Sequence, residues 1–305
     1  MTRYTLGVNN CFAVKRWPEP DAWATIVRDA MGLGLVQHSL DLVELAGPAG
    51  VWRGQARRVK DTSSRFGLTL HSTFTGLAAY SSNFLLDPDP AVRQQAEAWY
   101  RSAIAFTAIA GGRATGGHVG AYSVTEWRDA SRRREREQDL IMSLAMLATE
   151  ARTAGLSELY VENLAAAREP STMDGIARLL TDGDASHVPI KLCLDVGHQC
   201  VPGTTGAERD PYAWLERMGS RAPVVQLQQS DAEGDHHWPF TAALNVRGRI
   251  DADRVLAALD RSGADEVFLI LEVIPPFEQD DDQVLDDMVA SAAYWRDALA
   301  RHGRS

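Results

Sequence analysis

Cysteine is scarce in this sequence, with three residues among 305, at positions 11, 193 and 200. An odd number without regular spacing excludes the disulfide framework that stabilises small secreted domains, and reduced thiols in a cytosolic enzyme are the simplest interpretation. Cys193 lies two residues before Asp195 and would therefore face the same side of a strand. We expect it to be a small buried core residue rather than part of a site.

Long apolar runs and an excess of positive charge are also missing. The sequence has no run of about 18 apolar residues, and it does not begin with a basic segment followed by an apolar one. We therefore expect no membrane span and no signal peptide, and a cytoplasmic location. The formal net charge of −10 argues against a protein that binds nucleic acid through its overall positive field. A small-molecule partner is expected, which can be anionic if a few local arginines bind it. A homo-oligomer stays open.

Apolar runs typical of strands alternate with helical patterns along the whole chain. The expected strands cover residues 4–9, 36–42, 68–73, 114–119, 159–162, 191–195, 224–228 and 268–272. A helical pattern follows each strand, without a Ser/Gly linker or a break in composition. Such alternation implies a parallel sheet, and eight units of about 35 residues imply a closed (β/α)₈ barrel. We predict the α/β class and one TIM-barrel domain spanning residues 1–305.

Several helix boundaries carry local signals. Asp89-Pro90 predicts a helix start and Gly111-Gly112 its end, because aspartate caps the first turn and proline fits within it. Ser171-Thr-Met-Asp174 resembles a capping box that opens a shorter helix. One long helix is expected over residues 125–154. The mixed charges of Arg132–Glu137 near its start indicate a solvated face, with a phosphate-binding role as the alternative.

Four expected strands end in an oxygen-bearing side chain, and these are Glu162, Asp195, Gln228 and Glu272. In a (β/α)₈ barrel the carboxyl ends of the strands carry the chemistry, and consecutive strands lie about 4.8 Å apart. Three carboxylates and an amide oxygen suit a hard divalent cation such as Mn²⁺, Mg²⁺ or Co²⁺. Without a cation the carboxylates would raise one another's pKa. The alternative is that arginines or lysines at the barrel mouth pair with them.

The motifs around these residues resemble the xylose-isomerase-like sugar (phosphate) isomerases and epimerases. Val161-Glu-Asn163 is similar to the first ligand segment of that family, and Glu272 ends the last strand as the fourth ligand does. Asp195-Val-Gly-His198 matches its Asp-x-x-His, in which the aspartate binds metal and the histidine contacts substrate. Gln228-Gln-Ser-Asp231 stands where the family has His-x-x-Asp, with the histidine as ligand. The glutamine would shift the site towards oxygen-preferring metals and away from zinc.

The first loop narrows the resemblance to one branch of the family. Gly7-Val-Asn-Asn-Cys-Phe and Lys15-Arg-Trp-Pro resemble the erythrulose-1-phosphate 3-epimerases of erythritol breakdown. Removing a proton next to a ketone produces an enediolate, whose charge a divalent ion can stabilise. Epimerisation then requires one proton-transfer group on each face, and Glu162 and Glu272 lie at opposite ends of the ligand arc. An aldose–ketose isomerase could use the same pair.

Other residues are candidates for binding the substrate. A phosphate would need cations such as Arg168, Arg247, Lys15 or Arg16, of which Arg168 follows Glu162 by six residues. His198 and His118 are expected to contact the substrate. His71, His236 and His237 are also expected at strand ends or in loops at the barrel mouth. For His236 and His237 the alternative is an exposed loop away from the site.

Three other functions compete with this interpretation. A related DNA-repair endonuclease with three zinc ions would need more histidine ligands and a basic groove, and the net charge and Gln228 oppose it. A non-catalytic barrel could bind a sugar without metal, with Gln228 marking a decayed site. The third alternative is a hydroxypyruvate-type or aldose–ketose isomerase on the same site.

Overall fold

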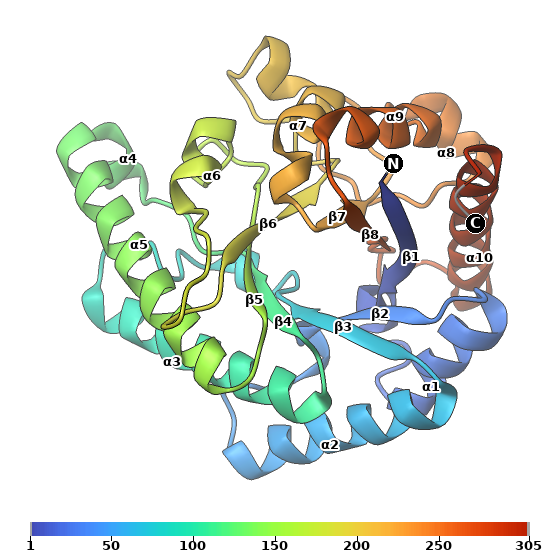
Figure 1. Ribbon diagram of the computed structural model, residues 1–305, viewed down its shortest axis with the longest axis horizontal. Helices are drawn as coiled ribbons and strands as arrows, with labels where there is room; N and C mark the ends of the chain where they lie inside the picture. Colours follow the sequence, from blue (N-terminus) through green and yellow to red (C-terminus); the bar gives the residue numbers. More distant parts are fainter. Residues whose placement is uncertain (1, 304–305) are drawn as a thin grey trace.

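Eight parallel strands form a closed barrel in the computed structural model, which describes residues 2–303 (Figure 1). Each strand pairs in parallel with the next one in the sequence, and β1 closes the barrel by pairing with β8 from Arg3–Glu266 to Val8–Leu271. This confirms the predicted (β/α)₈ fold. The strands are β1 (Arg3–Asn9), β2 (Leu35–Ser39), β3 (Thr69–Phe74), β4 (Ala114–Gly117), β5 (Glu158–Glu162), β6 (Ile190–Asp195), β7 (Val224–Leu227) and β8 (Glu266–Leu271).

Helices surround the barrel and connect its strands (Figure 1). The connecting helices are α1 (Pro20–Thr25), α2 (Ala49–Phe66), α3 (Pro90–Ala110), α5 (Ala130–Thr153), α6 (Met173–Leu179), α7 (Pro211–Met218), α9 (Ala252–Ser262) and α10 (Asp281–Arg301). Two short helices, α4 (Val124–Arg128) and α8 (Ala242–Arg247), lie in loops. Between residues 2 and 303, no helix has the length and apolarity needed to cross a membrane.

The helix-boundary predictions are confirmed at α3 and wrong at two other places. The Asp89 side chain accepts a hydrogen bond from Ala91 N at 2.8 Å, and Gly111 ends α3 with a φ of 88°. The single helix expected over residues 125–154 is broken at Asp129, whose extended backbone ends α4 and whose carboxylate caps α5. The segment around this break is charged and solvated, so it has no periodic pattern of apolar residues whose interruption would mark the break. Thr172, rather than Ser171, caps α6.

The barrel interior contains a small apolar layer of its own. Cys193 lies in it, as predicted, and is fully buried. A much larger cluster fills the space between the sheet and the surrounding helices. The interior layer supports the strand ends from below, because its residues alternate along the strands with those facing the helices. Its buried members are Leu35, Phe74, Ala114, Tyr160, Cys193, Val224 and Ile270.

We predict that Ile270→Ala lowers the free energy of unfolding by about 2–5 kcal/mol, because Ile270 is fully buried in this layer and its truncation leaves a cavity. Val246, whose side chain is 88% exposed, is the control, and Val246→Ala should change stability by no more than about 0.5 kcal/mol. Urea unfolding of both variants measures the difference. Equal stability of the two variants would contradict a packed barrel interior.

Candidate metal centre and active site

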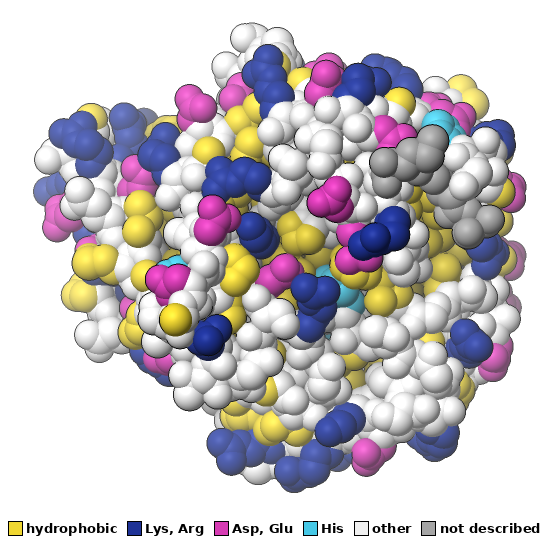
Figure 2. Space-filling model, viewed as in Figure 1, with side chains coloured by type: hydrophobic (Ala, Val, Ile, Leu, Met, Phe, Trp, Pro, Cys, Tyr) yellow, Lys and Arg dark blue, Asp and Glu magenta, His cyan; other side chains and the backbone are white. Residues whose placement is uncertain are grey.

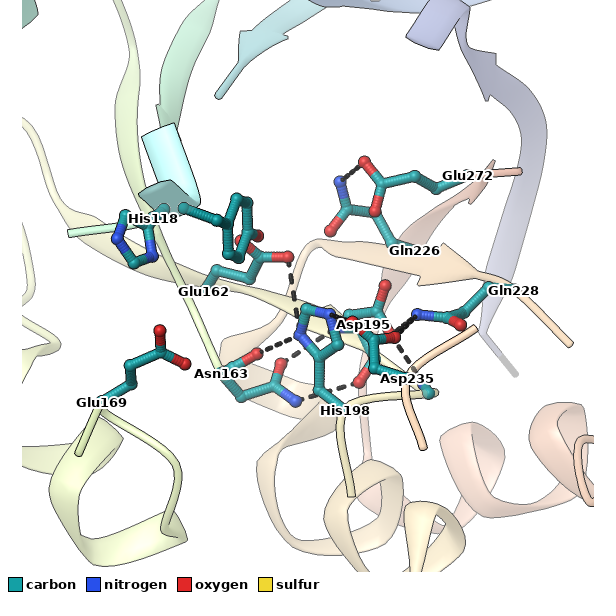
Figure 3. A network of polar contacts seen from close by, with 12 residues as sticks. His118, Glu162, Asn163, Glu169, Asp195, His198, Gln226, Gln228, Asp235 and Glu272 are labelled. Atoms are coloured by element: carbon teal, nitrogen blue, oxygen red, sulfur yellow. Dashed lines mark hydrogen bonds and ion pairs between the residues drawn. The ribbon is translucent and has the colours of Figure 1, made fainter. Parts of the chain in front are cut away.

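Three carboxylates meet at the carboxyl end of the barrel (Figure 3). Glu162 is the last residue of β5, Asp195 the last of β6, and Glu272 directly follows β8. One carboxylate oxygen from each lies within 4.8 Å of the others, and all three residues are buried. The structure therefore brings together three of the four predicted ligands, and the fourth, Gln228, lies beside them.

The charges of these carboxylates are not balanced by arginine or lysine. Among residues 2–303, no arginine or lysine forms an ion pair with Glu162, Asp195 or Glu272, although the imidazoles of His198 and His237 lie near Glu162 and Glu272. Burial raises the pKa of Glu162 to about 8, and the Asp195 carboxylate adds to this rise while His198 opposes it. Burial also raises the pKa of Glu272 well above its ordinary value, with His237 opposing and Glu162 adding. The alternative of pairing with arginines or lysines at the mouth is thus wrong for the described chain.

Two carboxylate oxygens fit a divalent cation. Within the described part of the chain, Glu162 Oε1 and Asp195 Oδ2 are buried and accept no hydrogen bond. Buried acceptors of this kind are costly unless a partner satisfies them. A hard cation would satisfy both and offset the mutual repulsion of the three carboxylates.

Tyr80 orients Glu162 from a loop. It lies in a short 3₁₀ helix (Ala79–Ser81) after β3, and its hydroxyl donates a hydrogen bond to Glu162 Oε2. Its ring packs against His118 with centroids 4.5 Å apart. Burial and the neighbouring Glu162 raise the pKa of Tyr80 well above its ordinary value, so the phenol keeps the proton that it donates. Sequence analysis missed Tyr80, because an isolated aromatic residue in an irregular polar loop belongs to no periodic pattern.

Amide groups hold Glu272 from inside the barrel. Asn9 Nδ2 and Gln226 Nε2 each donate a hydrogen bond of 2.7 Å to Glu272 Oε1. The same two amide nitrogens also donate to Gln37 Oε1, at 3.1 and 2.9 Å. The other carboxylate oxygen, Oε2, lies 3.8 Å from His237 Nδ1. One oxygen of Glu272 is therefore fixed, and the other faces the site.

Asn163 and His198 are tied to Asp195. The Asn163 side chain donates to Asp195 O and accepts from Asp195 N, both at 2.9 Å, which extends the pairing of β5 with β6 beyond the strand end. His198 Nδ1 lies 2.6 Å from Asn163 O, so Nδ1 must carry the hydrogen and donate it. His198 Nε2 then faces the site and lies 3.2 Å from Asp235 Oδ2. This position suits the predicted contact of His198 with a substrate.

Gln228 links Asp195 to the loop that follows β7. Its Oε1 accepts a hydrogen bond of 2.6 Å from the backbone N–H of His237. Because a backbone N–H can only donate, this contact fixes the amide orientation. Gln228 Nε2 then donates to Asp195 Oδ1 at 3.0 Å and to Asp235 Oδ1 at 2.7 Å. Gly197 leaves room for the amide, since a Cβ there would lie 2.2 Å from Gln228 Cδ.

The loop after β7 contributes Asp235 and His237, which the prediction did not include. An antiparallel bridge between Gln229 and Trp238 returns the loop to the barrel mouth. Asp235 Oδ2 lies 3.4 Å from His237 Nε2. Burial would raise the pKa of Asp235, but the imidazoles of His198 and His237 outweigh it and hold that pKa well below its ordinary value.

The two adjacent histidines of this loop differ in their surroundings. His236 stacks on Trp238 with centroids 4.0 Å apart and pairs with Asp231. The His237 side chain is 13% exposed and faces the carboxylates. Burial would lower the pKa of His237, but Asp235, Asp195 and Glu272 raise it to about 10. The exposed-loop alternative for this pair is therefore wrong for His237, and a His-His dipeptide gives no local signal that separates the two side chains.

A cleft of about 200 Å³ opens over the site, and Tyr80, His237, Glu272, Arg16, Asp41 and Phe277 are among its lining residues. Arg16 donates to Asp281 and to the carbonyls of Pro276 and Gln279, while the exposed Lys15 lies over the Phe277 ring at 4.3 Å.

The other predicted substrate contacts lie outside the lining of this cleft. Arg168 donates to Tyr122 O at 2.5 Å, and the exposed Arg247 stacks on Trp238 at 4.8 Å. His118 is fully buried behind Tyr80. His71 is also buried, with its ring 4.3 Å from that of Phe268.

Acidic and basic side chains are interspersed over the face of the molecule that Figure 2 shows.

Comparison with known proteins places the chain among sugar isomerases and epimerases. A family model described as xylose isomerase-like TIM barrel matches residues 30–297. A D-erythrulose 1-phosphate 3-epimerase from Brucella abortus (strain 2308) is 27% identical over 295 residues, which cover 95% of each chain.

Solved structures agree with this placement. A protein from Rhodospirillum rubrum, provisionally assigned as a xylose isomerase, is 34% identical with a TM-score of 0.89, over 96% of this chain and 99% of that one. A D-psicose 3-epimerase from Clostridium cellulolyticum has the same fold, with a TM-score of 0.67 and 15% identity over 97% and 99% of the two chains.

We predict that Mn²⁺ raises the melting temperature of chelator-treated protein, because a cation that binds only the folded state stabilises it by about 2.7 kcal/mol at a hundred times its Kd. Asp195→Asn should lose most of this rise, since it removes a central carboxylate. Asp182→Asn, which alters an exposed aspartate paired with Lys191, is the matched control and should keep it. A rise of equal size in both variants would place the cation elsewhere.

Proposed function

Because the chain belongs to the xylose isomerase-like TIM barrel family, we propose that it is a metal-dependent epimerase that inverts C3 of a short ketose phosphate such as erythrulose 1-phosphate. The similarity to an erythrulose-phosphate epimerase over nearly the whole length of both chains supports the choice of substrate. The observation that carries the reaction is the pair Glu162 and Glu272, two buried carboxylates that approach one point from opposite ends of the β5–β8 arc.

Glu162 and Glu272 suit the two proton transfers. One takes the C3 proton as a carboxylate, and the other, which is protonated, returns a proton to the opposite face. Burial and the mutual repulsion of the carboxylates raise the pKa of both groups in the absence of a cation, which favours proton uptake by one of them. Tyr80 donates to Glu162 and the amides of Asn9 and Gln226 donate to Glu272, so each carboxyl keeps one oxygen oriented towards the substrate.

The residues that would hold a divalent ion are Glu162, Asp195 and Glu272, with a fourth ligand from the loop or strand end at β7. Mn²⁺ or Mg²⁺ is the expected ion, and Co²⁺ is an alternative. When bound, the ion would supply electrostatic stabilisation for the negative charge that develops on the two substrate oxygens. His198 Nε2 is buried without a hydrogen-bond partner among the described residues, which supports His198 as the group that binds a substrate hydroxyl.

The proposed substrate carries its phosphate at the rim of the cleft. Lys15 lies over Phe277, a lining residue, and is the candidate cation for the phosphate. Arg16 also lines the cleft, but its guanidinium pairs with Asp281. Arg168 and Arg247 are directed to Tyr122 and Trp238 instead. We propose a small-molecule partner, no nucleic-acid or membrane partner, and a cytoplasmic location.

We predict that the enzyme, supplied with Mn²⁺ or Mg²⁺ in D₂O, incorporates deuterium at C3 of erythrulose 1-phosphate, because epimerisation returns a solvent proton to that carbon. Proton NMR of a panel of tetrulose and pentulose phosphates, beside the unphosphorylated sugars, measures the exchange. Exchange at C1 with formation of an aldose would instead indicate an aldose–ketose isomerase. Equal rates with the unphosphorylated sugars would remove the phosphate from the proposal.

We predict that Glu162→Gln and Glu272→Gln each lower kcat by about 10²–10⁴-fold or more, since each removes one of the two proton-transfer groups. The matched controls are Glu158→Gln and Glu266→Gln, which alter glutamates at the opposite ends of the same two strands, β5 and β8. Steady-state assays in both directions measure the effect. Full activity of either site variant would refute the two-carboxylate scheme.

A further inference from the structure

The Gln228 amide after β7 is oriented so that its oxygen faces away from Asp195. Gln228 is one of the four strand-end residues, but its Oε1 accepts a hydrogen bond from His237 N at 2.6 Å. Its other polar atom, Nε2, is a donor that faces Asp195 and Asp235. A donor cannot bind a cation, because it presents hydrogen atoms and no lone pair. The amide oxygen is thus directed to the loop, and Gln228 turns a donor rather than a lone pair towards Asp195.

His237 brings an imidazole to this position. One of its ring nitrogens, one of His198 and one carboxylate oxygen of Asp195 lie within 4.8 Å of one another. Its Nδ1 lies 3.3 Å from Glu272 O, so Nδ1–H can donate to that carbonyl. Nε2 is then the ring nitrogen left to bind a cation, once the cation has displaced its proton. A metal-binding histidine commonly donates its second N–H to a backbone carbonyl in this way.

The backbone of His237 is held in an unusual conformation. Its φ is 48°, in the left-handed region that residues with a side chain seldom adopt. Gln228 fixes the N–H side, and Ile274 N donates to His237 O at 3.1 Å on the other side. Strained residues held from both sides occur at functional sites. This conformation directs the His237 ring to the carboxylates, whereas the ring of His236 stacks on Trp238.

We propose that His237 supplies the nitrogen ligand of the metal centre and that Gln228 positions it instead of binding the ion. The imidazole group and the carboxylate group share Asp195. The proposed centre would join them through this residue, with Glu162, Asp195 and Glu272 as oxygen ligands and His237 as the nitrogen ligand. The inference rests on the proposed metal dependence, and it changes which metals the site suits. An imidazole restores affinity for ions such as Mn²⁺ and Co²⁺ relative to Mg²⁺, which prefers oxygen.

Mn²⁺ binding by chelator-treated protein tests the ligand. Calorimetry measures the affinity, and pulsed electron paramagnetic resonance detects the coupling of a ¹⁴N nucleus to bound Mn²⁺. His237→Gln should lower the affinity by more than about 100-fold, beyond the 10–100-fold typical of residues that only orient a ligand. The ¹⁴N coupling should disappear. The matched control, His236→Gln, should keep both the affinity and the coupling.

A second variant separates the loss of a ligand from damage to the loop. Glycine adopts a φ of 48° without strain, so His237→Gly removes the ring and keeps the backbone conformation. Added imidazole should restore the ¹⁴N coupling and part of the Mn²⁺ affinity in this variant. Gln228→Leu should weaken the coupling, because it releases the backbone of His237. An unchanged coupling would show that Gln228 does not position the ring.

The outcomes distinguish this inference from the proposed function. Retained affinity and coupling in His237→Gln would overturn the ligand assignment, and unchanged coupling in Gln228→Leu would overturn the positioning role of Gln228. Either result would leave the metal-dependent reaction intact. An unaltered protein that binds no Mn²⁺ in calorimetry would overturn both. Loss of the coupling in His237→Gln and its recovery with imidazole in His237→Gly support the assignment.

Discussion

The burial of three carboxylates around one point is the constraint on which the rest of this site depends. Charged carboxylates lose their hydration when buried, and three of them repel one another at these separations. The barrel can hold Glu162, Asp195 and Glu272 in place because their backbones belong to paired strands or directly follow one. Closure through β1 and β8 places Glu272 opposite Glu162 rather than at a distant sheet edge. The repulsion is therefore built into the fold, and a cation or a proton relieves it.

Neutral groups orient these carboxylates without cancelling their charge. Asn9 and Gln226 donate to Glu272, Gln228 donates to Asp195, and Tyr80 donates to Glu162. An arginine in the same positions would fix the carboxylates equally well, but its charge would also neutralise them and remove their attraction for a cation. Amides and a phenol orient the oxygens and preserve that attraction. This is the physical difference between a structural ion pair and a metal centre.

The barrel and its ligand arc could be predicted from the sequence because both follow from local patterns. The apolar runs before Glu162, Asp195 and Glu272 mark strands, and parallel strands bring their carboxyl ends to one rim. Tyr80, Asp235 and His237 could not be predicted in this way. Their positions depend on a 3₁₀ turn after β3 and on the bridge between Gln229 and Trp238. Both features lie in loops, where the sequence shows no periodic pattern of apolar residues.

The division between strand and loop has a consequence for how the site tolerates change. The barrel strands fix the positions of the carboxylates. The position of the His237 ring depends instead on the conformation of the loop after β7. Gln228 joins the two, because its amide binds both Asp195 on the barrel and the His237 backbone in the loop. With a histidine at position 228, the strand would provide the imidazole directly and the loop would be free to vary. With glutamine, the proposed metal centre includes the loop after β7, and the conformation of this loop at His237 would come under the same constraint as the strand ends.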